Sequence, residues 1–475
     1  MDVLRRLFEA HFHAPPENAQ PLQGQLGGSG RAIVRLTGGG KTAIGILHSV
    51  REENVAFVEF SRHFRRHGLP VPEIYAEDLA HGAYLEEDLG DVTLFEFLGA
   101  HREGDAIGTE AVAAYRKVLA VLPRFQVEAA GDLNYKVCYP RSSFDRQSIA
   151  WDLNYFKYYF LRLAGVPFNE QALEQDFGRL TKFLLAARHD YFLYRDFQSR
   201  NIMLCDGRPF FLDYQGGRKG ALQYDVASLL FDGKADLPPE LRQQLLDEYL
   251  DRLAGFIALD RAAFMEHYYA YVYVRILQAL GAYGFRGFYE RKTHFLQSVP
   301  YALKNLRWLA THVRLPVEVP ALLEALEAIT VSEKLQNLAP AAAGLTVRIF
   351  SFSFHRAPPV DESGHGGGFV FDARSLPNPG REERFRSLTG KDAAVIDYLS
   401  QQESVRQFLD HAESLIDACV ANYRERGFSS LMVSFGCTGG QHRSVYLAEQ
   451  LARHLRGTNG VETVVRHTQL ETMGK

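Results

Sequence analysis

The chain has 475 residues, of which 46% are hydrophobic and 23% are charged, a composition typical of a globular protein and not of a disordered one. A chain of this length exceeds what one hydrophobic core holds, so two or three domains are expected. The formal net charge of −4 excludes a general electrostatic attraction to nucleic acid or to an anionic membrane.

The cysteines lack the paired spacing of a zinc site or of a disulfide framework, which favours a reducing compartment. Residues 1–8 are typical of a short amphipathic helix and lack the apolar run of a signal peptide. No segment reaches the roughly eighteen consecutive apolar residues that are needed to cross a bilayer. We therefore expect a cytoplasmic protein without a membrane partner.

The first hundred or so residues contain the signals of a small β lobe, predicted at about 20–90. The runs 32–36 and 42–47 flank the three glycines at 38–40, a pattern that predicts an antiparallel hairpin. A helix over 52–67 follows, and after it a short strand that continues into a connector.

From about residue 106 the apolar periodicity changes to that of long helices, which predicts a helical lobe at about 91–338. Helices are expected at 106–129, 146–165, 169–189, 238–254, 260–283 and 317–337. The aromatic residues of 264–275 recur at helical spacing, which favours core packing over a ligand site.

The most specific pattern of the chain consists of Asp196, Asn201 and Asp213. Two short apolar runs around the turn 205–207 predict a β-hairpin, which would bring Asn201 close to Asp213. Asp196 can accept a proton from an attacking hydroxyl, and the other two can supply oxygen ligands to Mg²⁺ on a triphosphate. An acidic surface hairpin is the alternative interpretation.

A linker of small residues at 339–344 precedes a second domain, predicted at 345–475. Strands and helices alternate there, which predicts a smaller α/β domain with a mixed or parallel sheet. Strands are expected at 345–354, 430–435 and 461–466, and helices at 391–399, 401–426 and 441–457.

A glycine-rich turn before the helix at 441–457 has the composition of an anion site. Unpaired N–H groups and the positive end of the helix dipole attract a phosphate, and His442 and Arg443 add donors. The spacing from Cys437 to Arg443 is also that of a protein tyrosine phosphatase loop, but Gly436 stands where phosphatases have His. A small buried residue at the end of a strand is the alternative for Cys437.

With these motifs, residues 20–335 resemble the aminoglycoside phosphotransferase family, in Arg195-Asp196, Asn201, Asp213 and the later segment 224–230. The segment 194–203 is most similar to the AmgK-like branch of anomeric amino-sugar kinases, whose prototype phosphorylates N-acetylmuramate and N-acetylglucosamine at C1. The resemblance implies an α+β, protein-kinase-like bilobal fold, ATP and Mg²⁺ as cofactors, and an N-acetyl amino sugar as the acceptor.

The same resemblance assigns roles to individual residues. Asp196 would be the catalytic base, and Asn201 and Asp213 would be the metal ligands. Arg195 and Arg200 would lie beside the transferring phosphoryl group, with a structural salt bridge as the alternative for either. The triphosphate and adenine would be received by Gly27, Gly28, Ser29, Gly30, Lys41 and the connector near Glu87.

One departure from the family pattern concerns the lysine that kinases carry in the third strand, because the centre of that strand is apolar here. The cations that could replace it are Lys41, Arg35 and Arg31, unless the metal acts alone. The candidates for its helix partner are Glu52, Glu53 and Glu59. A catalytically silent pseudokinase scaffold with an RNA-adaptor tail is therefore an alternative to the kinase.

Residues 345–470 resemble the family of RapZ C-terminal domains, in 351–354, 371–379, 388–390 and 436–445. The resemblance implies that a sugar phosphate or nucleotide sugar binds at Thr438, Gly439, Gly440, His442, Arg443 and Ser444, with His355, Arg374 and Asn378 as candidate additional contacts. RNA is the less favoured partner, because fifteen Lys and Arg are balanced by fifteen Asp and Glu from residue 345 onward. A bifunctional kinase and phosphatase is the remaining alternative.

Overall fold

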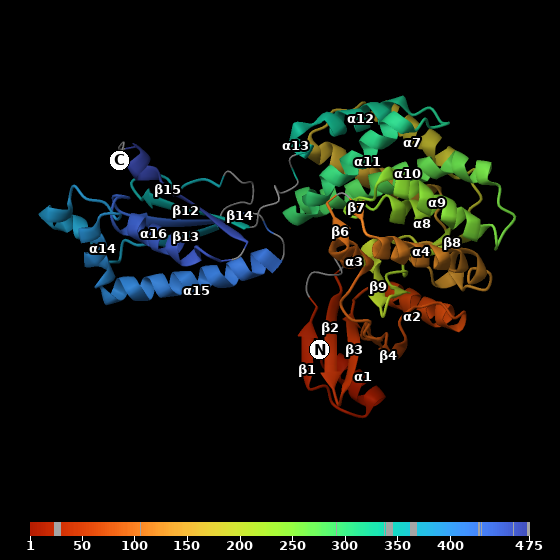
Figure 1. Ribbon diagram of the computed structural model, residues 1–475, viewed down its shortest axis with the longest axis horizontal. Helices are drawn as coiled ribbons and strands as arrows, with labels where there is room; N and C mark the ends of the chain where they lie inside the picture. The colour runs from red at the N-terminus through yellow and green to blue at the C-terminus, as the bar shows by residue number, and fades with distance from the viewer. Residues whose placement is uncertain are drawn as a thin grey trace. The chain divides into compact units, whose positions relative to one another are not determined.

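The computed structural model describes residues 1–22, 30–104, 106–290, 292–336, 338, 345–361, 368–425, 428, 430–458 and 460–472. The chain divides into two compact units (Figure 1). The first consists of Met1–Glu290 and Ser298–Leu338, and the second of Arg291–Gln297 and Ala339–Lys475. Within the described ranges, no helix combines the length and apolar character that spanning a membrane requires.

The β lobe of the first unit is a five-stranded antiparallel sheet in the order β1-β2-β3-β5-β4. Its strands are β1 (Asn18–Pro21), β2 (Ala32–Gly38), β3 (Lys41–Leu47), β4 (Ile74–Asp78) and β5 (Ala83–Glu86). The predicted hairpin of β2 and β3 is confirmed, and Gly39 and Gly40 form its turn with φ of 57° and 70°. Helix α1 (Asp2–Phe12) inserts Leu4 and Phe8 into the apolar core on one face of this sheet.

Helix α2 (Arg51–Arg66) connects the β lobe to the segment that follows Asp213. Phe57 lies between two aromatic rings, with ring centroids 5.3 Å from Tyr84 of β5 and 4.9 Å from Tyr214. The Ser61 and Tyr214 hydroxyls are 2.6 Å apart. These contacts couple the position of α2 to that of the candidate metal ligand next to Tyr214.

The helical lobe is built around α10 (Arg261–Gly284), which packs against α5, α8 and α11. Tyr268, Tyr271 and Tyr273 of α10 are almost fully buried, so the interpretation of the aromatic stretch as core is confirmed. The helices of this lobe include α3 (Leu94–Ala100), α4 (Thr109–Pro123), α5 (Arg146–Phe156), α6 (Arg162–Ala164), α7 (Glu170–Leu184), α8 (Gln223–Leu230), α9 (Pro239–Leu253), α11 (Val299–His312), α12 (Pro320–Val331) and α13 (Glu333–Gln336).

Two short pairs of antiparallel strands frame the loop that carries Asp196. Strand β8 (Tyr191–Leu193) leads into the loop and pairs with β11 (Arg218–Gly220). Strands β9 (Ile202–Cys205) and β10 (Arg208–Phe211) form the predicted hairpin, with Asp206 and Gly207 at positive φ in the turn. Lobe architecture and hairpin together confirm the predicted bilobal α+β fold of the first unit.

The second unit contains a four-stranded parallel sheet in the order β13-β14-β12-β15 (Figure 1), which confirms the predicted α/β class. The strands are β12 (Leu345–Ser353), β13 (Gly368–Asp372), β14 (Ser430–Cys437) and β15 (Val461–His467), and the helices are α14 (Ala393–Ser400), α15 (Glu403–Glu425), α16 (Arg443–Leu455) and α17 (Thr468–Thr472). Strand β14 is buried along its whole length, and α16 packs against it and against β12.

Candidate active site and anion-binding loop

The backbone of the loop with Asp196 is held by a buried carboxylate on α8. The N–H groups of Tyr194 and Arg195 donate to Asp225 at 2.9 and 3.0 Å, and the Gln126 amide donates to it at 3.1 Å. Burial raises the pKa of Asp225 to about 7. Three donors converge on this one side chain, so the hydrogen bonds hold the backbone at the start of the loop against α8.

Asp196, Asn201 and Asp213 meet, as their spacing predicts. The Asn201 amide nitrogen donates to the Asp196 carbonyl at 2.8 Å and to the Asp213 carboxylate at 3.1 Å. Burial and the nearby Asp196 carboxylate raise the pKa of Asp213. Two half-buried carboxylates and an amide that converge fit a hard divalent cation, whose charge would relieve the repulsion between the carboxylates.

The cation beside this trio is Arg31, which precedes β2. Its guanidinium lies 3.3 Å from Asp213 and 2.9 Å from Glu53 of α2, and its side chain is only 9% exposed. Of the cations and glutamates that the sequence left open, Arg31 and Glu53 form an ion pair beside Asp213. Arg35 is engaged elsewhere, with the carboxylates of Asp88 and Asp91.

Lys41 does not lie near the trio. It pairs with Gly38 at the turn of the β2–β3 hairpin, whereas Arg31 adjoins the opposite end, where Ala32 pairs with Leu47. Six residues of strand separate the two ends, or about 20 Å at 3.3 Å per residue. The prediction that Lys41 contacts the triphosphate is not supported by this geometry. The physical reason is that the hairpin points the start of β3 away from Asp213.

A cavity lined by Leu212, the chain neighbour of Asp213, has two apolar walls. Leu22, Ile33 and Ile44 line it from the β lobe, and Met203 and Leu212 from the helical lobe. Such a slot suits a flat aromatic base, because both faces of the base would be covered by aliphatic groups. Of the four predicted triphosphate contacts, Gly27, Gly28 and Ser29 lie outside the described residues, and Gly30 is exposed next to Arg31.

Glu87 borders this cavity at the connector between the lobes. Its N–H donates to the Glu73 carbonyl at 2.9 Å, and its carboxylate accepts from the Glu73 N–H at 3.1 Å. The Glu87 carbonyl oxygen has no partner among the residues described.

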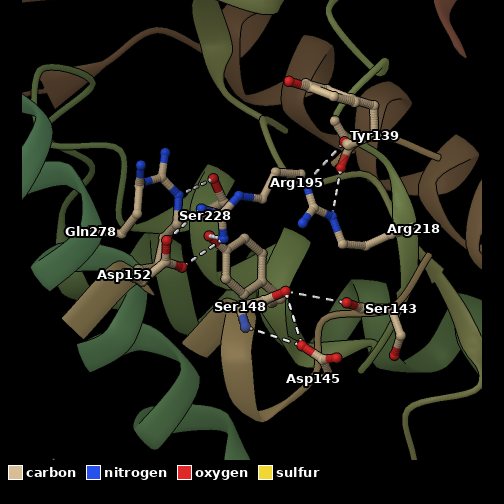
Figure 2. A network of polar contacts seen from close by, with 12 residues as sticks. Tyr139, Ser143, Asp145, Ser148, Asp152, Arg195, Arg218, Ser228 and Gln278 are labelled. Carbon is tan, nitrogen blue, oxygen red and sulfur yellow. Dashed lines mark hydrogen bonds and ion pairs between the residues drawn. The ribbon is translucent and has the colours of Figure 1, made fainter. Parts of the chain in front are cut away.

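The two arginines of the catalytic loop differ in their surroundings. Arg195 forms a bidentate ion pair with Asp152, both contacts at 2.7 Å (Figure 2). It also donates to the Tyr224 hydroxyl at 2.7 Å. These contacts are those of the structural salt bridge and not of a phosphoryl contact. Arg200 is exposed, binds the Gln198 side-chain oxygen and lines the cavity.

The glycine-rich loop of the second unit is tightly organised around Cys437 and Arg443. The Gly440 N–H donates to the Cys437 sulfur at 3.2 Å, and the Ser444 hydroxyl lies 3.1 Å from the same sulfur. The Arg443 guanidinium donates to the carbonyls of Arg374 and Leu376, both at 2.9 Å. Cys437 is 2% exposed, which favours the interpretation as a buried strand-end residue.

The other predicted anion contacts of this loop differ in their surroundings. The Thr438 hydroxyl accepts from Arg443 at 3.3 Å, and buried His442 bonds to the Phe385 carbonyl at 2.8 Å. Gly440 has φ of +67°, and a Cβ there would lie 2.8 Å from the Ser353 nitrogen, so only glycine fits. The neighbouring Gly439 has open space around it.

Arg374, Asn378 and His355 make mainly local contacts. The Arg374 side chain pairs with Asp372 at 2.7 Å and lies over the Phe354 ring. The Asn378 side chain accepts from the Gly380 N–H at 3.2 Å, so it stabilises its own turn. His355 is exposed, and its N–H donates to the Ser353 hydroxyl.

Residues 25–264, about half of the chain, match the model of the phosphotransferase enzyme family, APH. The chain belongs to this family. Residues 345–471 match the model of the RapZ C-terminal domain, so this member of the phosphotransferase family carries a second, RapZ-like domain.

The curated relatives share with this phosphotransferase-family chain a stretch of about the length of its second domain. A nucleotide-binding protein from Xylella fastidiosa strain M23 is 44% identical over 127 residues, which are 27% of this chain and 42% of the relative. One from Thioalkalivibrio sulfidiphilus is 44% identical over 126 residues, 26% of this chain and 42% of the relative. The chain therefore spans less than half the length of these relatives.

Similar solved structures cover the first domain. They include a thermostable mutant of the aminoglycoside phosphotransferase APH(4)-Ia, with 15% identity, a TM-score of 0.41, and 60% of this chain and 93% of that chain covered. Choline kinase LicA from Streptococcus pneumoniae has 14% identity and a TM-score of 0.43, with 66% and 99% covered.

The sequence analysis did not predict one polar residue that lines the cavity of this family member. Glu86 ends β5 with 7% of its surface exposed, and its Oε2 has no partner among the described residues. Burial raises its pKa to about 8. The available signal was an acidic residue directly after the buried run 83–85, at the position where a strand side chain alternates inward.

Proposed function

We propose that the first domain is an ATP- and Mg²⁺-dependent kinase that transfers a phosphoryl group to a hydroxyl of a small acceptor. The observation that carries this proposal is the convergence of Asp196, Asn201 and Asp213 beside a cavity with two apolar walls. A silent pseudokinase has no need of this trio, nor of the Arg31–Glu53 pair at its side.

Each residue of the trio has a defined task in the proposed reaction. The Asp196 carboxylate takes the proton of the acceptor hydroxyl as its oxygen attacks phosphorus. Asn201 and Asp213 would hold Mg²⁺, which when bound offsets the negative charge of the triphosphate. Arg31 and Arg200 place further positive charge on the side of Asp213, where the phosphoryl oxygens would lie.

The nucleotide is proposed to place its base between the apolar walls of the cavity. The Glu87 carbonyl would accept from the exocyclic amine of adenine. Gly27, Gly28, Ser29 and Gly30 stay predicted triphosphate contacts, because a glycine-rich turn allows close approach of backbone N–H groups.

The proposed acceptor is an N-acetyl amino sugar such as N-acetylmuramate or N-acetylglucosamine. An open groove is the proposed binding site of this acceptor, with Tyr135, Lys136 and Lys219 among its lining residues. Lys219 follows Gly216 closely in the chain, and a Cβ at Gly216 would lie 3.6 Å from the Asp196 carboxylate. Neither lysine has a carboxylate partner among the residues described, so the groove favours an acceptor with an acidic group.

A panel of acceptors tests the kinase. Amino sugars, aminoglycosides and nucleosides are incubated with ATP and Mg²⁺, and phosphorus NMR identifies the phosphorylated position. Wild-type protein should phosphorylate an amino sugar, and Asp196→Asn should lower kcat by about 10²- to 10⁴-fold while ADP binding persists. Equal activity of the two proteins, or transfer to no member of the panel, would contradict the proposal.

We propose that the second domain binds a sugar phosphate or a nucleotide sugar and thereby regulates the kinase. Support comes from the RapZ C-terminal match and from the loop 438–444 at the start of α16, where N–H groups and the helix dipole favour an anion. Buried Arg443 adds positive charge behind the loop. RNA stays the less favoured partner because the domain has no net positive charge.

The phosphatase alternative requires a thiolate of Cys437 that a substrate can reach. The sulfur is buried and already accepts a hydrogen bond from Gly440, and Arg443 is directed to two backbone carbonyls. Residues 345–475 are therefore expected to release no phosphate from phosphate esters. Phosphate release that Cys437→Ser abolishes would instead establish the bifunctional alternative.

A further inference from the structure

Two histidines and an aspartate converge at the end of α2, away from the trio described above. His63 and His67 are one helical turn apart, and Asp132 follows the π-helical turn η1 (Arg124–Glu128). The Asp132 Oδ1 atom lies 2.9 Å from His67 Nε2 and 3.6 Å from His63 Nε2. All three ligand atoms lie within 4.8 Å of one another.

These separations suit a tetrahedral metal ion. Zinc binds imidazole nitrogen and carboxylate oxygen at about 2.0–2.2 Å, which places neighbouring ligand atoms about 3.3 Å apart in a tetrahedron. The two distances to Asp132 lie on either side of that value. Small side-chain rotations would complete the triangle, and a water molecule would take the fourth position, as in other zinc sites with three protein ligands.

His63 is the buried member of the three, with 4% of its surface exposed. In the metal-free protein, His63 Nε2 lies 2.7 Å from the Ala129 carbonyl. A metal on Nε2 would replace that contact, and the ring proton would then reside on Nδ1. Asp132 is 66% exposed, which gives an ion access from solvent.

We propose that His63, His67 and Asp132 form a binding site for a divalent transition metal such as Zn²⁺. Within the described ranges, no second trio of His, Cys, Asp or Glu side chains has this spacing. The ligands are imidazole nitrogens and one carboxylate, which favours zinc over the hard cation Mg²⁺.

The bound metal would fasten α2 to the helical lobe. Only two of its ligands come from α2, and the third belongs to the segment after α4. The Arg124 guanidinium already bonds to the His67 carbonyl at 2.7 Å across the same junction. Because α2 also carries Glu53, the partner of Arg31, the metal would restrain the helix that positions the cation beside Asp213.

The test uses tag-free, full-length protein that has been stripped of metal with a chelator. Zn²⁺ is titrated in the presence of millimolar Mg²⁺ and a chromophoric competitor, and thermal unfolding is followed in parallel. Wild-type protein should bind one equivalent and unfold at a higher temperature with Zn²⁺. His67→Ala and Asp132→Asn should each weaken binding by more than about tenfold and remove the thermal shift.

The matched control is His81→Ala. His81 forms an exposed pair with Asp78 at 2.8 Å on the same lobe, but no third ligand completes that pair in the described structure. This variant should bind Zn²⁺ like the wild type. Unchanged binding by both His67→Ala and Asp132→Asn, or no stoichiometric Zn²⁺ binding by wild-type protein, would overturn the proposal. Both replaced side chains are at least partly exposed, so loss of folding does not obscure the result.

Discussion

Arg31 Nη1 lies 3.3 Å from Asp213 Oδ1, so a cation of the β lobe reaches the candidate metal ligand of the helical lobe. The same guanidinium is held by Glu53 at 2.9 Å. We propose this ion pair, built from an arginine that precedes the second strand, as the counterpart of the lysine–glutamate pair of kinase-like enzymes. An arginine retains its charge when it is buried, which suits a side chain that is 9% exposed.

Replacement of Arg31 by Ala should raise the KM for ATP and lower kcat, with kcat/KM falling by about 10²- to 10³-fold. The reason is that this variant loses the buried cation that contacts Asp213. Lys41→Ala is the matched control, because Lys41 belongs to the same hairpin but lies at its far end. Steady-state kinetics with varied ATP measure both variants. A defect in Lys41→Ala with a normal Arg31→Ala would restore the lysine as the triphosphate contact.

The trio could be predicted from the sequence because its members lie within eighteen residues of one another around a single hairpin. The apolar runs and the turn residues predict that hairpin locally, so the spacing of the three residues in the chain was sufficient to infer that they lie close together. The pair of Arg31 and Glu53 joins a strand to a helix, and its identity depends on how α2 packs through Phe57. Such tertiary contacts cannot be inferred from the spacing of residues in the chain. The sequence therefore could not decide which of three cations replaces the lysine, or which of three glutamates is its partner.

Among the elements that the sequence analysis missed, two illustrate different reasons. Helix α11 has a readable apolar stripe in Leu303, Leu306 and Leu309, all buried, and the periodicity could have predicted it. Strand β13 is short and lies at the edge of its sheet, and its pattern alone does not distinguish it from a loop. The predicted helix at 317–337 divides into α12 and α13 at Ser332, where ψ is 109°.

Asp225→Ala should destabilise the first domain and abolish activity together. The change leaves the N–H groups of Tyr194 and Arg195 without their acceptor in a buried place, at a cost of about 1–3 kcal/mol for each unsatisfied group. Tryptophan fluorescence during urea unfolding reports on this domain, since Trp151 and Trp308 both belong to it. Wild-type stability together with full activity would contradict the role of Asp225 as the support of the loop.

Glu86 should make the stability of the first domain depend on pH. The folded state keeps the Glu86 proton up to about pH 8, whereas the unfolded chain releases it near the ordinary value of 4.5. The free energy of unfolding should therefore fall as pH rises from about 4.5 to 8, by at most about 1.4 kcal/mol per pH unit, and level off above. Glu86→Gln has no such proton to lose, so this contribution to the pH dependence of the free energy of unfolding is absent from the variant.

The difference between wild type and Glu86→Gln isolates this carboxyl from Asp225, whose pKa is also raised. Urea unfolding of both proteins is measured at pH 5, 6, 7 and 8. The glutamine variant should gain stability relative to wild type as pH rises through this window. A difference that does not change with pH would show that Glu86 is ionised in the folded protein.

Lys219→Ala should distinguish acceptors that differ in charge, if the groove with Lys136 and Lys219 receives the sugar. N-acetylmuramate carries a carboxylate that N-acetylglucosamine lacks, and a lysine without an ion-pair partner would bind it. The Nζ of Lys219 lies 5.0 Å from the centroid of the Tyr135 ring, so the ammonium is held over the groove wall. The KM for N-acetylmuramate should rise about tenfold, which corresponds to about 1.4 kcal/mol, with little change for N-acetylglucosamine.

Lys182→Ala on the exposed face of α7 is the control for a general loss of positive charge, because Lys182 lies outside the groove. Its KM should be unchanged for both sugars. An equal rise of KM for both sugars in Lys219→Ala would place the lysine in general support of the groove and not in recognition of the carboxylate. No change for either sugar would place the acceptor elsewhere, while the phosphoryl-transfer proposal, which rests on Asp196 and its partners, would stand independently.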